Sequence, residues 1–212
     1  MSLSLYEKHR PSKLSEVIGQ SKVIKQIESV GDPGGRAFWI SGASGIGKTT
    51  LGRIIASQIA DSWYITELDA TSLTPAKLRD IEQSMAMFGG GKGGRAYLVN
   101  ESHGLRKDTI RQLLVLLERL PSHVTIIFTT TKDGQEALFE DEIDSHPLLS
   151  RCIVLTLTNQ GLSKLFAARV REIAQAEGLD GQPESVYVKL AQKCKNNMRS
   201  MLQSVESGAM KL

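Results

Sequence analysis

The chain has 212 residues, of which 41% are hydrophobic and 23% are charged, and its formal net charge is +3. This length suits one large domain or a core with a small second domain, and the composition is that of an ordinary globular protein. The small positive charge is compatible with a nucleic-acid partner but is too weak to indicate one alone.

The composition also excludes several classes of protein. Cys152 and Cys194 lack the spacing of a zinc site or a disulfide framework, so we expect reduced thiols. No apolar run approaches the roughly 18 residues of a membrane span. The first residues, MSLSLYEKHR, lack the apolar segment of a signal peptide. We therefore expect an intracellular protein, cytosolic or nuclear, with no membrane partner.

Strands and helices alternate over most of the chain. In chain order we expect an extended lead at 6–19, a helix at about 20–30, a strand at 37–41, a helix at 48–60, a strand at 63–70, a helix at 75–87, a strand at 96–100, a helix at 106–120, and strands at 124–130 and 152–157. Because the strands are unbroken apolar runs, they predict a parallel sheet covered on both faces.

The pattern changes near residue 158. Beyond it we expect helices only, at about 160–176, 183–194 and 197–207. The predicted fold is therefore α/β, with a five-stranded core over residues 1–158 and a three-helix lid over residues 159–212.

The segment GASGIGKT, residues 42–49, fits the phosphate-loop pattern G-x-x-x-x-G-K-[ST]. Its glycines let backbone N–H groups point at phosphate oxygens. Lys48 adds a positive charge, and the Thr49 hydroxyl is suited to bind Mg²⁺. The pattern lies between a strand and a helix, as this chemistry requires. We expect nucleotide to be bound by Gly42, Ala43, Ser44, Gly45, Ile46, Gly47, Lys48, Thr49 and Thr50.

Kinases, GTPases and motor ATPases share this loop, so the segments around it must distinguish between them. The lead YEKHRPSKLSEVIG precedes the loop, and YLVNE, VTIIFTTT, HPLLSRC and NNMRSML follow it in that order. Together these segments resemble the AAA+ ATPases, and among them the clamp-loader subunits of DNA replication, which are replication factor C and the bacterial clamp-loader complex. The similarity extends from Tyr6 to about residue 207.

The resemblance implies a P-loop AAA+ fold, a role for each matching residue, ATP and Mg²⁺ as cofactors, and other AAA+ subunits, duplex or primed DNA and a sliding clamp as partners. Glu101 would orient the attacking water, and Arg151 would be an arginine finger that enters the ATP site of a neighbouring subunit. The other implied positions are Arg10, Pro11, Val17 and Ile18 around the adenine, Thr130 or Thr131 (sensor 1) near the γ-phosphate, and Arg199 (sensor 2) on the γ-phosphate.

Position 100 departs from the family pattern, which has aspartate where this chain has Asn100. An amide keeps one oxygen for the Mg²⁺ site but lacks the negative charge that attracts the metal. Since Lys48 and Thr49 are present, we expect ATP binding to survive and hydrolysis to slow. Two hypotheses stay open, a slow or conditional ATPase and a non-hydrolysing subunit that lends Arg151 to a neighbour. Another AAA+ DNA motor is a further alternative, whereas a small-molecule kinase would need an arginine-rich lid.

Basic residues gather at the start of the helix expected at 106–120. The resemblance implies that Arg106, Lys107 and Arg111 contact DNA there; the alternative is a solvated basic helix start. Basic side chains near a helix N-terminus oppose its dipole, which favours a role other than stability.

Clamp-loader subunits continue beyond the lid into a helical collar domain. This sequence ends at Leu212, where the collar would begin. Two explanations are open: the chain is a fragment, or the protein assembles differently.

Overall fold

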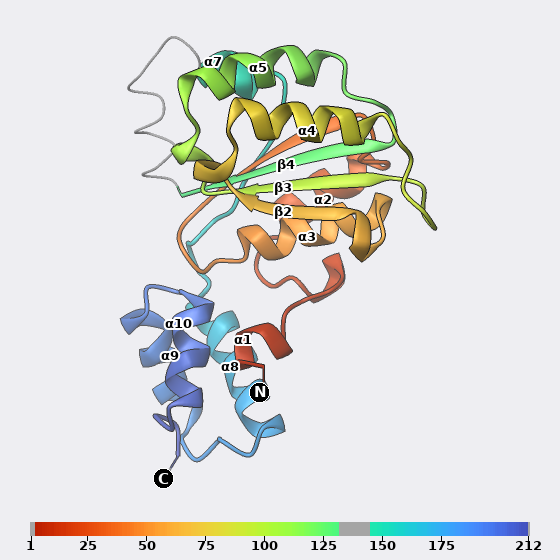
Figure 1. The fold of residues 1–212 in the computed structure, drawn as a ribbon. Coiled ribbons are helices and arrows are strands. Elements are labelled where there is room, and N and C mark those ends of the chain that lie inside the picture. Colours follow the sequence, from red (N-terminus) through yellow and green to blue (C-terminus); the bar gives the residue numbers. More distant parts are fainter. Residues whose placement is uncertain (1–2, 132–144, 212) are drawn as a thin grey trace.

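A five-stranded sheet in the order β2-β3-β4-β1-β5 forms the centre of the computed structural model, which describes residues 3–131 and 145–211 (Figure 1). All neighbouring strands are parallel. The strands are β1 Arg36–Ser41, β2 Ile65–Asp69, β3 Arg95–Asn100, β4 Val124–Thr130 and β5 Ile153–Thr156. The expected α/β fold with a five-stranded parallel sheet is therefore confirmed.

Helices connect the strands and complete the chain. The α-helices of the described residues are α1 Leu5–Lys8, α2 Ser21–Val30, α3 Lys48–Ile59, α4 Pro75–Met85, α5 Lys107–Glu118, α7 Ser145–Ser150, α8 Ser163–Ala176, α9 Glu184–Lys193 and α10 Met198–Glu206. Short 3-10 turns occur at η1 Leu14–Glu16, η2 Ser62–Tyr64, η3 Ala70–Ser72 and η4 Ser102–Gly104. Within these described segments, no helix is long and apolar enough to cross a membrane.

Alternation along each strand sends side chains to two apolar layers. Phe38 and Ile40 of β1 pack in the cluster that contains the buried residues of α2 and α3. Ala37 and Trp39 pack in the cluster that contains those of α4 and α5. Helices therefore cover both faces of the sheet, and the carboxyl ends of its strands lie along one edge, where the phosphate loop begins.

Two expected elements differ from the structure. The lead is not extended throughout, because Leu5–Lys8 form α1, which packs against α10 with Leu5 buried. The strand expected at 63–70 begins only at Ile65. The residues before it form η2, closed by a 2.8 Å hydrogen bond from the Tyr64 N–H to the Asp61 carbonyl oxygen. Trp63 is 93% exposed there, so its apolar character did not indicate a buried strand.

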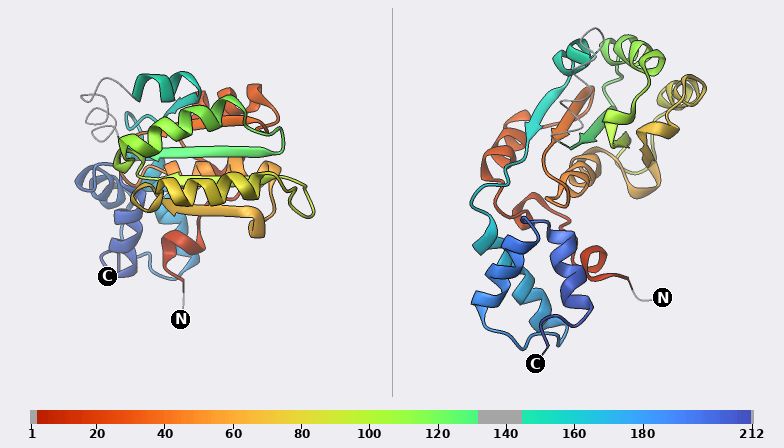
Figure 2. Two further views of the ribbon diagram at one scale, coloured as in Figure 1. Left: turned by 45° about the horizontal axis from the view of Figure 1, so that its top comes forward. Right: turned by 90° about the vertical axis from the view of Figure 1, so that its left-hand side faces the viewer.

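The three last helices form a group beside the sheet, and Figure 2 shows α1 lying next to α10 within it. Buried residues of this group, such as Phe166 and Met201, belong to the same apolar cluster as α3. At the junction, the buried Gln20 side chain donates to the Thr158 carbonyl oxygen (2.9 Å) and accepts from the Thr158 N–H (3.0 Å).

Candidate nucleotide-binding site

The loop after β1 has the backbone geometry of a phosphate cradle. Gly45 has φ +70° and Gly47 has φ +109°, both in the left-handed region that glycine adopts without a Cβ clash. α3 begins at Lys48, so its free N–H groups and its positive dipole end lie at the loop. The sequence pattern and this geometry agree on an anion-binding loop.

Lys48 is 7% exposed, and its Nζ donates to the carbonyl oxygens of Gly42 (3.0 Å) and Ala43 (2.9 Å). Burial lowers the pKa of this lysine, the Glu101 carboxylate raises it, and Arg199 lowers it again. A partly desolvated ammonium group gains from a multiply charged anion, since phosphate oxygens replace the solvation that burial removes.

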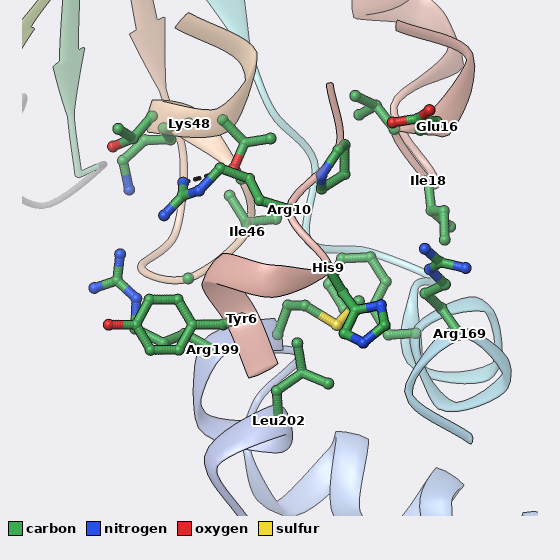
Figure 3. Close-up of a pocket in the computed structure, with 18 of the residues that line it drawn as sticks. Tyr6, His9, Arg10, Glu16, Ile18, Ile46, Lys48, Arg169, Arg199 and Leu202 are labelled. Atoms are coloured by element: carbon green, nitrogen blue, oxygen red, sulfur yellow. Dashed lines mark hydrogen bonds between the residues drawn. The ribbon is translucent and has the colours of Figure 1, made fainter. Parts of the chain in front are cut away.

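A single pocket brings the phosphate loop, the lead and the helical group together (Figure 3). The expected base-slot residues Arg10, Pro11, Val17 and Ile18 all line it, as do residues 44–50 of the loop. Gly42 and Ala43 do not line the pocket; their carbonyl oxygens hold Lys48 instead. Apart from these two, the expected binding residues lie around one cavity.

The helical group supplies pocket residues that the sequence motifs missed. They are Phe166, Arg169 and Ile173 of α8 and Met198 and Leu202 of α10. Tyr6 and His9 of the lead also line the pocket. The amphipathic patterns of α8 and α10 predicted helices, but no motif indicated which ends of them face a ligand, and the helix α1 in the lead was not predicted.

Arg10 connects the lead to the phosphate loop. Its guanidinium donates to Thr50 Oγ1 at 3.1 Å and forms an ion pair with Glu7. The hydrogen bond from Arg10 lowers the pKa of Glu7, as do the charges of Arg10, Arg53 and Arg199. Because its guanidinium is engaged on both sides, Arg10 holds the lead over the loop.

Asn100 lies at the carboxyl end of β3, directly beside the first turn of α3. Its Oδ1 accepts hydrogen bonds from Thr49 Oγ1 (3.1 Å) and Thr129 Oγ1 (2.9 Å). Its Nδ2 donates to Glu67 Oε1 at 2.7 Å. The group thus presents oxygen toward Thr49, and oxygen ligands are those that Mg²⁺ prefers. Thr49 and Asn100 therefore fit a Mg²⁺ ion delivered with the nucleotide.

Protein side chains alone offer no metal cage here: the described residues contain no cluster of three or more His, Cys, Asp or Glu side chains able to hold a metal ion.

The chain is similar to subunits of DNA polymerase III and of replication factor C. No protein-family model matches the chain. DNA polymerase III subunit gamma from Buchnera aphidicola subsp. Acyrthosiphon pisum is 27% identical over 95% of the chain and 60% of its own length. Escherichia coli DNA polymerase III subunit tau is 26% identical over 96% of the chain and 35% of its length. Replication factor C small subunit from Halobacterium salinarum is 24% identical over 96% of the chain and 62% of its length.

Solved structures give the same fold. A structure of a Thermotoga maritima RuvB variant superposes with a TM-score of 0.73 at 22% identity, over 93% of this chain and 64% of that one. The structure of the Thermotoga maritima RuvB Holliday junction branch migration motor superposes with a TM-score of 0.68 at 23% identity, over 93% and 64%. The chain resembles the clamp-loader AAA+ ATPases. Matches cover 42%, 60% and 31% of the first three curated relatives, so the chain spans less than two thirds of their length.

Glu101, expected to orient the attacking water, lines the pocket with a half-exposed side chain. Its φ is +51°, which is rare for a residue with a Cβ, and such strain often accompanies functional sites. His103 Nδ1 lies 3.6 Å from the Glu101 carboxylate.

Of the two expected sensors, one lines the pocket. The Arg199 guanidinium of α10 lies over the Tyr6 ring, 5.3 Å from its centroid (Figure 3). Thr130 and Thr131 do not line the pocket. The buried Thr130 has its Oγ1 3.2 Å from His103 Nδ1, and it donates to the Thr131 carbonyl oxygen.

Thr129, which precedes Thr130 and Thr131, is the threonine of β4 that donates a hydrogen bond to Asn100. Strand alternation explains the difference of one position. Ile127 of β4 packs in the cluster that contains α3, whereas Phe128 packs in the opposite one, so Thr129 faces α3 and Thr130 faces away. The alternation of side chains along residues 124–130 is therefore the sequence feature that could have identified Thr129.

Arg151, the matched finger, lies away from the pocket of its own subunit. It precedes β5, whose Ile153 pairs with Phe38 in the first half of β1, while the phosphate loop follows the last residue of β1. Its guanidinium donates to the Pro147 carbonyl oxygen at 2.9 Å and forms an ion pair with Glu118.

The three expected DNA-contact residues are exposed on the first turns of α5. Arg106 precedes the helix as its N-cap, with its guanidinium 3.6 Å from the Asp108 carboxylate. Lys107 and Arg111 follow on the helix itself. All three lie outside the nucleotide pocket.

Proposed function

We propose that the chain is an ATP-binding AAA+ subunit of a clamp-loader-like assembly, and that it hydrolyses ATP slowly or only when stimulated. The observation that carries this proposal is the pocket in which Lys48, Arg199 and Arg10 converge from three separate parts of the chain. The sequence similarity to clamp-loader subunits over 95% or more of the chain supports the choice among AAA+ proteins.

Each residue then has a distinct task. The loop N–H groups and Lys48 bind the β- and γ-phosphates, while the lead and the apolar side chains of α8 and α10 enclose the base. Bound Mg²⁺ would neutralise charge on the transferred phosphoryl group. Thr49 and Asn100 present the oxygens for it, Glu101 orients water toward the γ-phosphate, and Arg199 stabilises the developing charge.

Arg151 acts in trans in this proposal. Because Arg151 lies beyond the amino end of β5, it does not reach the ATP site of its own subunit. Full activity at that site then requires the arginine of a neighbouring AAA+ subunit. A finger contributes about 10³ to 10⁵ in rate. We further propose that residues 1–158 act as the nucleotide-binding core and residues 159–212 as a lid that moves with the state of the nucleotide.

Primed or duplex DNA and a sliding clamp are the proposed partners, by analogy with the similar proteins. The exposed basic residues Arg106, Lys107 and Arg111 form the proposed contact with the DNA backbone. A second function is favoured by one observation, the amide at Asn100: a subunit that holds ATP without hydrolysing it and lends Arg151 to a neighbour.

The test begins with ATP titration by calorimetry for the native protein, Lys48→Ala and Lys92→Ala. Lys92 is the matched control, because its Nζ also binds a backbone carbonyl, that of Ser57, but outside the pocket. We expect only Lys48→Ala to lose binding.

Steady-state turnover with Mg²⁺, with and without primed DNA, then distinguishes the two functions. Turnover stimulated by DNA supports the ATPase; tight binding with no turnover supports the holding subunit. Unchanged binding in Lys48→Ala would overturn both.

A further inference from the structure

We propose that Glu67 is a positioning residue of the metal site: through its hydrogen bond to Asn100 it supplies the negative charge that the amide lacks. This inference rests on the proposed function, since it concerns the Mg²⁺ that accompanies ATP. It also gives a physical reason for the departure from aspartate at position 100.

The hydrogen bond between Asn100 and Glu67 determines the orientation of the amide. A carboxylate only accepts hydrogen bonds, so the group that faces Glu67 at 2.7 Å must be Nδ2 of Asn100. Oδ1 is then directed toward the hydroxyls of Thr49 and Thr129. Glu67 therefore selects which end of the amide is presented to the metal site.

Glu67 reaches Asn100 from the neighbouring strand β2. In the parallel register Asp69, not Glu67, lies opposite Asn100. Asp69 is turned away, because its carboxylate accepts from the N–H and the hydroxyl of Thr71. Glu67 lies two residues earlier on the same face, and its longer side chain reaches Asn100 diagonally. A carboxylate therefore lies next to position 100, but it belongs to Glu67 on the neighbouring strand β2 rather than to β3 itself.

Arg53 of α3 contacts the other oxygen of this carboxylate. Its Nε donates to Glu67 Oε2 at 2.8 Å, and its Nη1 lies 3.8 Å from the Glu7 carboxylate. This partly exposed pair contributes little by itself. Because Arg53 binds Oε2, Oε1 is left to Asn100. The negative charge of Glu67 makes that hydrogen bond charge-assisted and polarises the amide oxygen.

Glu67 also explains why asparagine rather than aspartate suits position 100 in this chain. In this framework an aspartate would set a second carboxylate against Glu67 with no proton donor between them, and like charges in adjacent positions destabilise a sheet. Asparagine keeps one negative charge in the pair and a hydrogen bond within it. Asn100 and Glu67 therefore form a matched pair that replaces a single aspartate.

Four proteins test the pair: native, Glu67→Gln, Asn100→Asp and Asn100→Asp with Glu67→Gln. The measurement is the dissociation constant of ATP by calorimetry, once in MgCl₂ and once in EDTA. The dissociation constant in EDTA divided by that in MgCl₂, here called the Mg²⁺ ratio, measures how much Mg²⁺ strengthens ATP binding. Glutamine at 67 keeps the shape and an acceptor for Nδ2, but it removes both the charge and the oxygen that accepts from Arg53, so Arg53 is also varied as a control.

We expect Glu67→Gln to reduce the Mg²⁺ ratio by about 10-fold, within the range found for residues behind a metal ligand. The double variant, which again carries one carboxylate and one amide, should recover the native ratio. ATP affinity in EDTA should stay the same in both. Thermal unfolding without nucleotide and metal should show Asn100→Asp less stable than the native protein, and the double variant restored.

Two controls separate charge from packing. Glu82→Gln removes another ion-paired carboxylate, on α4 outside the pocket, and should keep the native ratio. Arg53→Gln should also keep it, because the carboxylate of Glu67 remains. A reduction in Arg53→Gln as large as in Glu67→Gln overturns the proposal, since the effect then belongs to the ion pair.

A native Mg²⁺ ratio in Glu67→Gln also overturns the proposal. So does equal weakening of ATP binding in MgCl₂ and in EDTA, which indicates a structural role only. Failure of the proposed function has a different signature: the native protein itself then binds no ATP under either condition.

Discussion

The main-chain N–H of Met198 donates to the carbonyl oxygen of Gly45 at 3.1 Å, so the first turn of α10 is fastened to the phosphate loop. Asn197, one residue earlier, caps α10 by accepting a hydrogen bond from the Ser200 N–H. The same helix carries Arg199 into the pocket. A change in the conformation of the loop is therefore transmitted directly to the helical group.

This contact predicts the effect of Gly45→Ala. Gly45 has φ +70°, and an added Cβ would lie 1.9 Å from Asn197 Oδ1. Backbone strain alone costs about 1–2 kcal/mol, and displacement of α10 adds to it. We expect a lower melting temperature together with weaker ATP binding. Gly161→Ala is the matched control, because Gly161 has φ +71° with open space around it. Equal effects of the two variants on stability and on ATP affinity would contradict a steric contact between loop and helix.

Arg151→Ala should leave ATP binding intact and lower stimulated turnover by about 10³ to 10⁵, the contribution of an arginine finger. The reason is that Arg151 lies outside the pocket of its own subunit. Glu118→Gln is the control, since it breaks the same ion pair from the other side and keeps the guanidinium. Steady-state turnover of the assembled protein with primed DNA measures both. Native stimulated turnover in Arg151→Ala would discard the trans-finger assignment.

The fold followed from the sequence because its strands are unbroken apolar runs between strong turn and helix signals. β4 was expected at 124–130 and lies at Val124–Thr130, and α3 was expected at 48–60 and ends at Ile59. The errors arose where local composition misleads. Tyr64 and Trp63 are strand-forming residues by type, yet a 3-10 turn places Trp63 in solvent.

The site was only partly predictable for a related reason. Motifs located Lys48 and Arg199, whose roles depend on the order of segments along the chain. Glu67 and Thr129 act by contact between strands, and such contacts depend on strand register and on alternation, which no single segment encodes. A difference of one residue at β4 moves a side chain to the opposite face of the sheet.

The lead is tied to α8 through Glu177, and this contact predicts a pH dependence. Hydrogen bonds from Lys8 (2.8 Å) and His9 (2.6 Å) lower the pKa of Glu177 below its usual value of 4.5. A carboxylate whose pKa is lower in the folded state stabilises the fold above the unfolded value, and that contribution disappears as the pH falls through the folded pKa. The difference in melting temperature between native protein and Glu177→Gln should therefore shrink as the pH falls below 4.5.

The matched control for this contact is Glu184→Gln, which removes another acidic side chain of the helical group, at the start of α9 and outside the pocket. Glu177→Gln should also weaken ATP binding at neutral pH, because the lead forms one wall of the pocket, whereas Glu184→Gln should not. A difference in melting temperature that persists unchanged at about pH 3 would show that Glu177 does not act through its charge.

The basic start of α5 gives the last prediction. Replacing Arg106 and Arg111 by alanine should weaken binding of primed DNA, because each phosphate contact releases counterions from the duplex. The slope of log K against log salt should fall by about 0.9 for each phosphate that these side chains no longer neutralise. ATP affinity should be unchanged, since neither residue lines the pocket. Fluorescence anisotropy of labelled primed DNA at several salt concentrations, with ATP present, measures the slope. Arg119→Ala, an exposed arginine at the other end of α5, is the matched control; equal slopes for both variants would show that DNA does not contact the start of this helix.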